Sequence, residues 1–165
     1  MTCSVLGERP NNFPFPFSKS CPQYISYRLR LSYTLRNLIE KGYSHFLTNM
    51  LSGAPLDFAE ALHQCRVYPD MKHITIEAVM PYERQYCSTI DSDTFLYLFS
   101  KCNQITSVSQ KNNQGSLKKR DQYIIDRSDL ILVIWNGTPS SGVRNTLQYA
   151  IRQNKKIQYL LLGEH

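Results

Sequence analysis

Small, polar and basic residues follow the apolar segments that are expected to form buried strands. One such set, Asn136–Gly142, lies between the unbroken apolar run Leu130–Trp135 and a segment with helical spacing, Val143–Asn154. A strand, a glycine-containing loop and a helix start present free backbone N–H groups and the positive end of a helix dipole. This pattern predicts a site for an anion, such as the phosphate of a small molecule.

Other loops are candidates for the same site, because ligands of doubly wound sheets bind beyond the carboxyl ends of the strands. Their hydroxyl, amide and guanidinium groups can donate hydrogen bonds to phosphate and sugar oxygens. No loop matches the glycine fingerprint of dinucleotide-binding proteins or the P-loop, so phosphate binding and simple turn geometry both stay open. The selected binding residues are Gly7, Arg9, Asn49, Ser52, Gly53, Glu83, Gln85, Arg120, Asn136, Gly137, Thr138, Ser141, Gly142 and Asn145.

The sequence offers no clear catalytic group. Glu8, Glu60 and Glu83 could approach these loops, but exposed glutamates are usually just solvated. Cys87 has no evident histidine partner for nucleophilic catalysis. We expect the serine pair 140–141 to cap the following helix. No catalytic residue is therefore predicted.

Arg9 has two interpretations of equal weight. It follows the first predicted strand and could clamp a phosphate or carboxylate of a ligand. Alternatively, its guanidinium could form an ion pair with Asp126 or Asp129.

Strand and helix patterns alternate along the whole chain. Strands are predicted at 2–6, 45–48, 73–80, 104–108, 130–135 and 157–162, and helices at 23–41, 55–67, 91–102, 116–127 and 143–154. Such alternation indicates an α/β fold, with a mostly parallel sheet of about six strands and helices on both faces. Because no shift in composition divides the chain, residues 1–165 are predicted to form one domain.

Helical spacing also predicts which side chains face the core. Arginines interleave with the apolar stripe of the first helix, and we expect them to be solvated. The segment 11–22 alternates phenylalanine and proline, which favours either a packed surface loop or an aromatic wall beside a ligand. The inward side chains predicted are Tyr24, Tyr27, Leu31, Leu35 and Leu38 in 23–41, Leu117, Arg120, Tyr123 and Ile124 in 116–127, and Val143, Leu147, Ala150 and Ile151 in the last helix.

Composition narrows the class of protein. The net charge of +6 favours anionic partners without choosing between nucleotide, nucleic acid and membrane surface. Five scattered cysteines with no C-x-x-C pair indicate reduced thiols in a cytoplasmic protein, and neither a metal site nor a cofactor is predicted. Neither a signal peptide nor an apolar run of membrane-spanning length is visible, so no membrane partner is expected.

Five motifs occur in order along the chain: Leu6–Pro10, Phe46–Pro55 with Ala59-Glu60, Met80–Gln85, Lys119–Asp129 and Trp135–Ala150. Their residues and spacing resemble those of the YpsA-like group of the SLOG superfamily. These short bacterial and phage proteins are Rossmann-like relatives of the Lonely Guy phosphoribohydrolases and of the DNA-processing protein DprA. The resemblance covers almost the whole chain and implies a Rossmann-like three-layer sandwich.

The chain departs from the family pattern where catalysis is concerned. Asn49 replaces a glycine, Pro55 replaces an aspartate, and Ser141 replaces the first glycine of a pair. Tyr149 stands where the phosphoribohydrolase relatives carry the glutamate that acts on the ribose. A tyrosine, with its ordinary pKa near 10, cannot replace a carboxylate base.

The resemblance therefore implies a pocket that binds a nucleotide-derived molecule without cutting it. The expected function is sensing or sequestration of an ADP-ribose-type or cyclic nucleotide signal, for example in anti-defence by a phage or mobile element. One alternative is a nucleoside-monophosphate phosphoribohydrolase that uses Glu60 or Glu83, and another is single-stranded nucleic-acid binding. A homo-oligomer is compatible with the resemblance, because related SLOG proteins associate.

Overall fold

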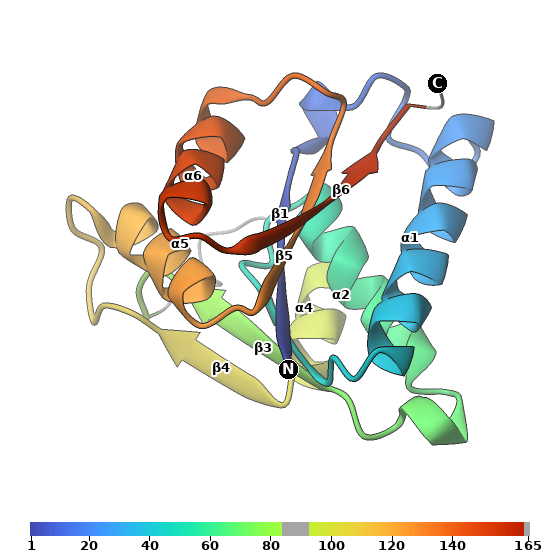
Figure 1. Ribbon diagram of the computed structural model, residues 1–165, viewed down its shortest axis with the longest axis horizontal. Helices are drawn as coiled ribbons and strands as arrows, with labels where there is room; N and C mark the ends of the chain where they lie inside the picture. The colour runs from blue at the N-terminus through green and yellow to red at the C-terminus, as the bar shows by residue number, and fades with distance from the viewer. Residues whose placement is uncertain (84–92, 164–165) are drawn as a thin grey trace.

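The protein is built on a six-stranded sheet in which every neighbouring pair of strands is parallel. The computed structural model describes residues 1–83 and 93–163. The strand order is β4-β3-β2-β1-β5-β6 (Figure 1). The strands are β1 (Thr2–Gly7), β2 (His45–Thr48), β3 (Thr75–Met80), β4 (Gln104–Ser107), β5 (Leu130–Trp135) and β6 (Lys156–Leu161). The α/β prediction is confirmed.

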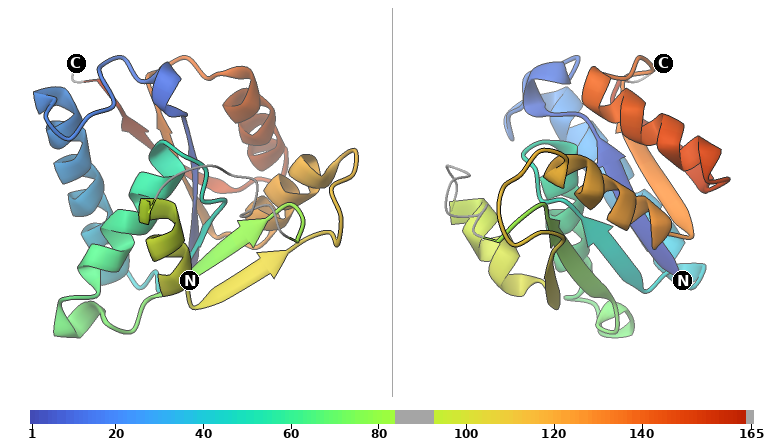
Figure 2. Two further views of the ribbon diagram at one scale, coloured as in Figure 1. Left: turned by 180° about the vertical axis from the view of Figure 1, so that it is seen from behind. Right: turned by 90° about the vertical axis from the view of Figure 1, so that its left-hand side faces the viewer.

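Helices cover both faces of this sheet, as Figures 1 and 2 show. One layer contains α1 (Pro22–Glu40), α2 (Ala54–Cys65) and α4 (Asp93–Lys101), and the other contains α5 (Ser116–Asp126) and α6 (Ser141–Arg152). Short 3-10 helices lie at η1 (Pro10–Asn12) and η2 (Pro69–Met71). Within the described residues, no helix is long and apolar enough to span a membrane.

The unbroken apolar run of β5 is explained by burial on both faces. Leu130, Leu132 and Ile134 belong to the large core cluster that contains side chains of α1 and α2. Ile131 and Val133 point the other way and pack with side chains of α6. A strand covered on both sides needs apolar residues at every position, and this is why the run does not alternate with polar residues.

The inward stripe of α1 is confirmed, since Tyr24, Tyr27, Leu31, Leu35 and Leu38 are all buried. The expectation for its arginines is wrong. Arg28 pairs with Asp57 and Glu60 of α2, and Arg30 donates to backbone carbonyls at the end of β6. The arginines of α1 therefore fasten it to its neighbours.

Two apolar side chains predicted to face inward point outward. Leu117 in α5 is 56% exposed, and Ile151 in α6 is 53% exposed. In α5 the buried positions are Ser116, Arg120, Ile124 and Ile125, so the inward prediction is confirmed for Arg120 and Ile124.

The aromatic and proline-rich segment packs against α1. Phe13 is buried and meets Phe15, Phe17 and Tyr27 edge-on, with ring centroids 5.0–5.6 Å apart. Of the two interpretations of this segment, the packed loop describes the structure.

Strand order reverses at β1, because the chain builds outward to β4 and then returns to β5 on the other side of β1. The carboxyl ends of β1 and β5 therefore flank the point where doubly wound proteins usually bind ligands.

Candidate functional site: a closed crevice and an open groove

Three loops at the carboxyl edge meet on Glu8, which directly follows β1. Its carboxylate accepts the backbone N–H of Ser140 at 3.0 Å and the side-chain amide of Asn12 at 3.1 Å. Its backbone carbonyl accepts the N–H of Ala54 at 3.0 Å, and its own N–H donates to the carbonyl of Ile134 at 3.1 Å. Only 1% of Glu8 is exposed, so this glutamate joins three loops from within.

Two of the predicted binding glycines serve this packing. A Cβ on Gly53 would lie 2.4 Å from the carbonyl oxygen of Glu8, and Gly53 has a φ of +100° that side-chain-bearing residues rarely adopt. A Cβ on Gly7 would lie 2.5 Å from the Cβ of Ala54. At both positions the absent side chain lets two chain segments touch, and the contact made is with protein.

The closed crevice is the place where these loops meet at the carboxyl ends of β1 and β5, and the carboxylate of Glu8 fills it. Ser140 is the N-cap residue of α6, but no side-chain cap bond forms there within the described part of the chain. Its N–H is taken by the Glu8 carboxylate. The anion site predicted from the sequence lies close to this point. The expectation that Glu8 is solvated is wrong, because its side chain is buried.

An open groove of about 590 Å³ lies beside the crevice, between α5 and α6. It brings together three of the predicted binding residues, Arg120, Gly142 and Asn145. Its other lining residues are Leu117, Lys118, Asp121, Gln122, Thr146, Gln148, Tyr149 and Arg152. The groove therefore presents cationic, amide and hydroxyl side chains together with one aromatic ring.

Arg120 is the unusual residue of this groove, because a guanidinium is seldom so buried. It is 5% exposed, and its Nε and Nη2 donate to Oδ1 of Asp121 at 2.9 and 2.8 Å. The other oxygen of Asp121 accepts the hydroxyl of Thr146 at 3.1 Å, which ties α5 to α6. Nη1 of Arg120 is buried without a hydrogen-bond partner among the described residues. Such an unmade bond costs about 1–3 kcal/mol, so an anion that supplied an acceptor here would be favoured.

The remaining candidates line neither the crevice nor the groove directly. Asn49 uses its side-chain oxygen to accept the N–H of Leu51, which shapes its own loop. The backbone of Glu83 bonds Ser109, while Gln85 lies outside the described residues. The other candidates are exposed, in the loops or at the start of α6: Arg9, Ser52, Glu83, Asn136, Gly137, Thr138 and Ser141.

The ion-pair interpretation of Arg9 finds no support in the described residues. Asp126 accepts the hydroxyl of Tyr149 at 2.8 Å, and Asp129 accepts the backbone N–H of Thr2 at 2.7 Å. Arg9 is exposed, and no ion pair involving it occurs within residues 1–83 and 93–163. Its side chain is available to a ligand.

The carboxylate and phenol near these loops are engaged elsewhere. Glu60 pairs with Arg28 at 2.6 Å on the side of α2 that meets α1. Tyr149 donates its hydroxyl to Asp126, and this bond raises the pKa of the phenol above its ordinary value. Cys87 lies outside the described residues, and burial raises the pKa of Cys3 to about 12 and of Cys102 to about 11.

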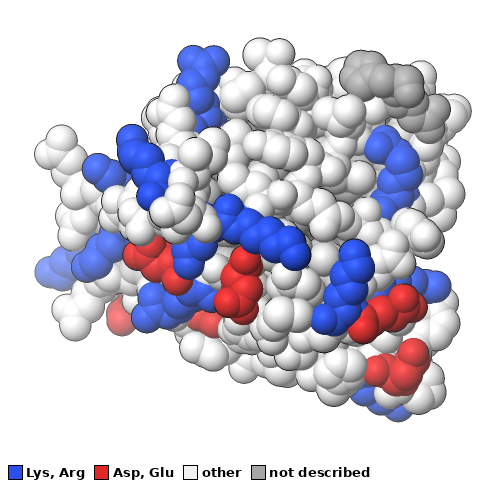
Figure 3. Space-filling model, in the orientation of Figure 1, with Lys and Arg blue, Asp and Glu red and all other residues white. Residues whose placement is uncertain are grey.

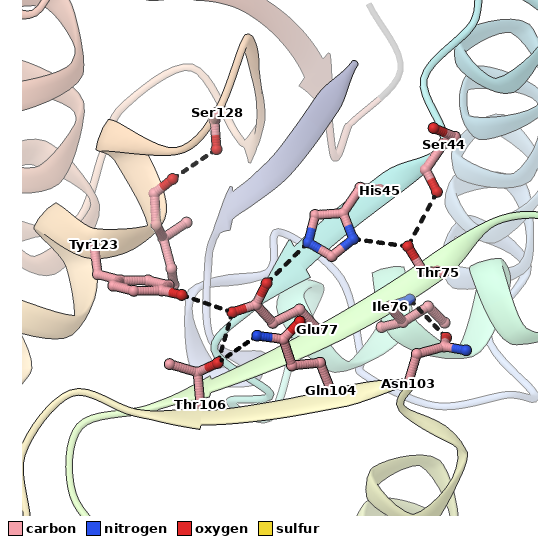
Figure 4. Close-up of polar contacts among 11 residues, drawn as sticks. Ser44, His45, Thr75, Ile76, Glu77, Asn103, Gln104, Thr106, Tyr123 and Ser128 are labelled. Atoms are coloured by element: carbon pink, nitrogen blue, oxygen red, sulfur yellow. Dashed lines mark hydrogen bonds and ion pairs between the residues drawn. The ribbon is translucent and has the colours of Figure 1, made fainter.

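A second polar cluster lies under α5, on the β2–β3–β4 part of the sheet (Figure 4). The carboxylate of Glu77, 3% exposed, accepts bonds from the hydroxyls of Thr106 at 2.7 Å and Tyr123 at 3.0 Å. His45, the first residue of β2, contributes a ring nitrogen 2.8 Å from the same carboxylate, and its other ring nitrogen lies 2.7 Å from the hydroxyl of Thr75. Burial alone would raise the pKa of Glu77, but these three bonds lower it below the ordinary value. This cluster was not foreseen, since its members come from four separate elements.

The fold and the edge loops define a doubly wound α/β domain with its polar loops gathered at the carboxyl edge of a parallel sheet. The sequence matches the YspA SLOG family over residues 3–164, so the chain belongs to that family. A search among curated proteins finds no match to it. Membership of this family implies nucleotide-related binding or processing.

Proposed function

We propose that this protein binds a phosphate-bearing, nucleotide-derived small molecule in the α5–α6 groove and holds it without cleaving it. The observation that carries the proposal is Arg120, which lines the open groove and whose buried Nη1 is a cationic donor without a partner among the described residues. A phosphate oxygen is a strong acceptor and would satisfy that donor. The groove volume of about 590 Å³ suits a ligand of nucleotide size.

The ligand class proposed is an ADP-ribose-type or cyclic nucleotide signal. Asn145, Thr146 and Gln148 can hydrogen-bond a sugar or base, and Tyr149 offers a ring edge beside them. The role proposed is sensing or sequestration of this signal, including anti-defence in a phage or mobile element. We place this role in the cytoplasm, because the buried thiols Cys3, Cys21 and Cys65 are free.

Two features support holding over cutting. Glu60, one of the two alternative catalytic carboxylates, is paired with Arg28 across α1 and α2. Tyr149 keeps its proton, because its hydrogen bond to Asp126 raises its pKa. A phosphoribohydrolase would need a carboxylate beside the ribose, and incubation with nucleoside monophosphates followed by chromatography for free base tests that alternative.

A thermal-shift panel of nucleotides, cyclic nucleotides and ADP-ribose tests the binding proposal. A ligand at 100 times its Kd adds about 2.7 kcal/mol of stability, which raises Tm by roughly 5–10 °C in a chain of this size. Arg120→Gln should abolish this shift. Arg127→Gln is the matched control, because Arg127 lies just beyond α5 with its guanidinium over the ring of Tyr123 and outside the groove.

The absence of a shift with every phosphate-bearing ligand would contradict the proposal. Equal thermal shifts in Arg120→Gln and Arg127→Gln would show that the ligand does not bind through Arg120.

A further inference from the structure

The positive charge of the chain is concentrated in its last third. Residues 106–165 contain nine lysines and arginines against four aspartates and glutamates, whereas residues 1–105 contain ten against nine. Nearly all of the net charge of +6 therefore belongs to the part that forms α5, β5, α6 and β6. Figure 3 shows lysine and arginine side chains gathered over α5, α6 and β6, with a few acidic side chains between them.

The cations of this surface face solvent without partners of opposite charge. Lys118, Lys119, Arg144 and Arg152 are exposed, and in the part of the chain that the structure describes none of them forms an ion pair. The three nearby aspartates are each bonded to another group: Asp121 to Arg120 and Thr146, Asp126 to Tyr149, and Asp129 to the backbone of Thr2. The surface thus resembles the electrostatic footprint of a polyanion-binding face.

An aromatic platform lies on the same side of the molecule. Tyr159 of β6 stacks on Trp135 of β5, with ring centroids 4.9 Å apart and planes inclined by 23°. Tyr159 is 47% exposed, so part of its ring is open to solvent. An exposed ring backed by a second ring is suited to stacking with an unpaired base.

We propose that the surface formed by α5, α6 and β6 binds single-stranded nucleic acid. The phosphates contact Lys118, Lys119, Arg144 and Arg152, and a base stacks on Tyr159. Single strands are favoured over a duplex because a paired base cannot reach the ring of Tyr159. Single strands are also favoured over an anionic membrane, because the surface between the cations is the polar lining of the α5–α6 groove. This proposal goes beyond small-ligand binding and does not depend on Arg120.

Fluorescence anisotropy with a labelled single-stranded 20-mer tests the proposal. Four phosphate contacts predict affinity roughly 50-fold weaker at 200 mM than at 50 mM salt. Because Trp135 is the only tryptophan and Tyr159 stacks on it, binding of an unlabelled oligonucleotide should also quench the intrinsic fluorescence. Tyr159→Leu should weaken binding about tenfold by removal of one stacked base.

A matched pair of charge reversals separates this surface from net charge alone. Lys119→Glu with Arg144→Glu should weaken binding at least tenfold. Lys41→Glu with Lys72→Glu changes the net charge by the same amount at exposed positions that lie outside α5, α6 and β6, and should weaken binding much less.

Three outcomes would overturn the proposal: no binding of the 20-mer at 50 mM salt, equal losses in the two double variants, or equal affinity for a duplex or for phosphatidylserine vesicles. Neither Lys119 nor Arg144 lines the α5–α6 groove, so the thermal shift with small ligands should survive in the first double variant. The two proposals can therefore fail independently.

Discussion

Removal of the Glu77 carboxylate should destabilise the protein in a way that depends on pH. Glu77→Ala leaves the hydroxyls of Thr106 and Tyr123 and the ring of His45 without their shared acceptor. Breaking a buried pair costs about 3–5 kcal/mol. The lower end applies because the side chain of His45 is 32% exposed and can recover bonds to water.

We therefore expect a loss of about 3 kcal/mol at pH 7, which corresponds to a fall in Tm of roughly 6–12 °C. Urea unfolding monitored by circular dichroism measures the loss. Glu77→Gln is the isosteric control: it keeps the volume and part of the hydrogen bonding, so its loss should be smaller than that of the alanine variant.

The dependence on pH follows from the direction of the pKa shift. The pKa of Glu77 is lower in the folded protein, so its contribution is present above the ordinary glutamate pKa and is lost as pH falls through the folded value. The difference between wild type and Glu77→Ala should be largest near pH 7 and should shrink below about pH 4. A loss under about 1 kcal/mol at pH 7, or a difference that does not shrink in acid, would refute this account of the cluster.

Two further predictions concern Gly53 in the closed crevice and Asp57 of α2, on the face of the sheet that α1 and α2 cover. Gly53→Ala should lower the free energy of unfolding by more than about 2 kcal/mol, and Gly137→Ala by about 1 kcal/mol. Both glycines have positive φ, but only a Cβ on Gly53 would meet a backbone carbonyl. Similar unfolding free energies in the two variants would contradict the close-packing argument. Burial raises the pKa of Asp57 to about 6 despite Arg28, so its contribution is present below the ordinary aspartate pKa and lost as pH rises through 6. Asp57→Asn should therefore gain stability relative to wild type between pH 4 and pH 7 in urea unfolding, and a constant difference would show that the carboxyl titrates normally.

The fold was predictable because its signals are local. The apolar run of β5 and the spacing of Tyr24, Tyr27, Leu31, Leu35 and Leu38 in α1 each reflect burial that repeats along one element. All six strands were predicted within two residues of their observed ends.

The closed crevice was not predictable in the same way, because it depends on partners far apart in the chain. Glu8 and Ser140 are separated by 132 positions, and nothing near Glu8 indicates burial. The exposure of Leu117 and Ile151 has a related cause: residue type indicates what could be buried, but neighbouring elements decide which side is covered. The groove lies next to the predicted site, and Arg120 was selected from the family resemblance, while its unpartnered nitrogen required coordinates.

The central position of β1 has a consequence for synthesis on the ribosome. β1 is made first and pairs with β2 soon afterwards, but its other edge waits for β5, whose register joins Cys3 to Leu130. Elongation proceeds at about 5–20 residues per second, so this edge stays unpaired for on the order of ten seconds. Throughout that interval the nascent chain displays an apolar strand edge, which is the kind of surface that chaperones bind and that misassembles between chains. Changes that delay β5 should therefore lower the yield of folded protein without altering the stability of the molecules that do fold.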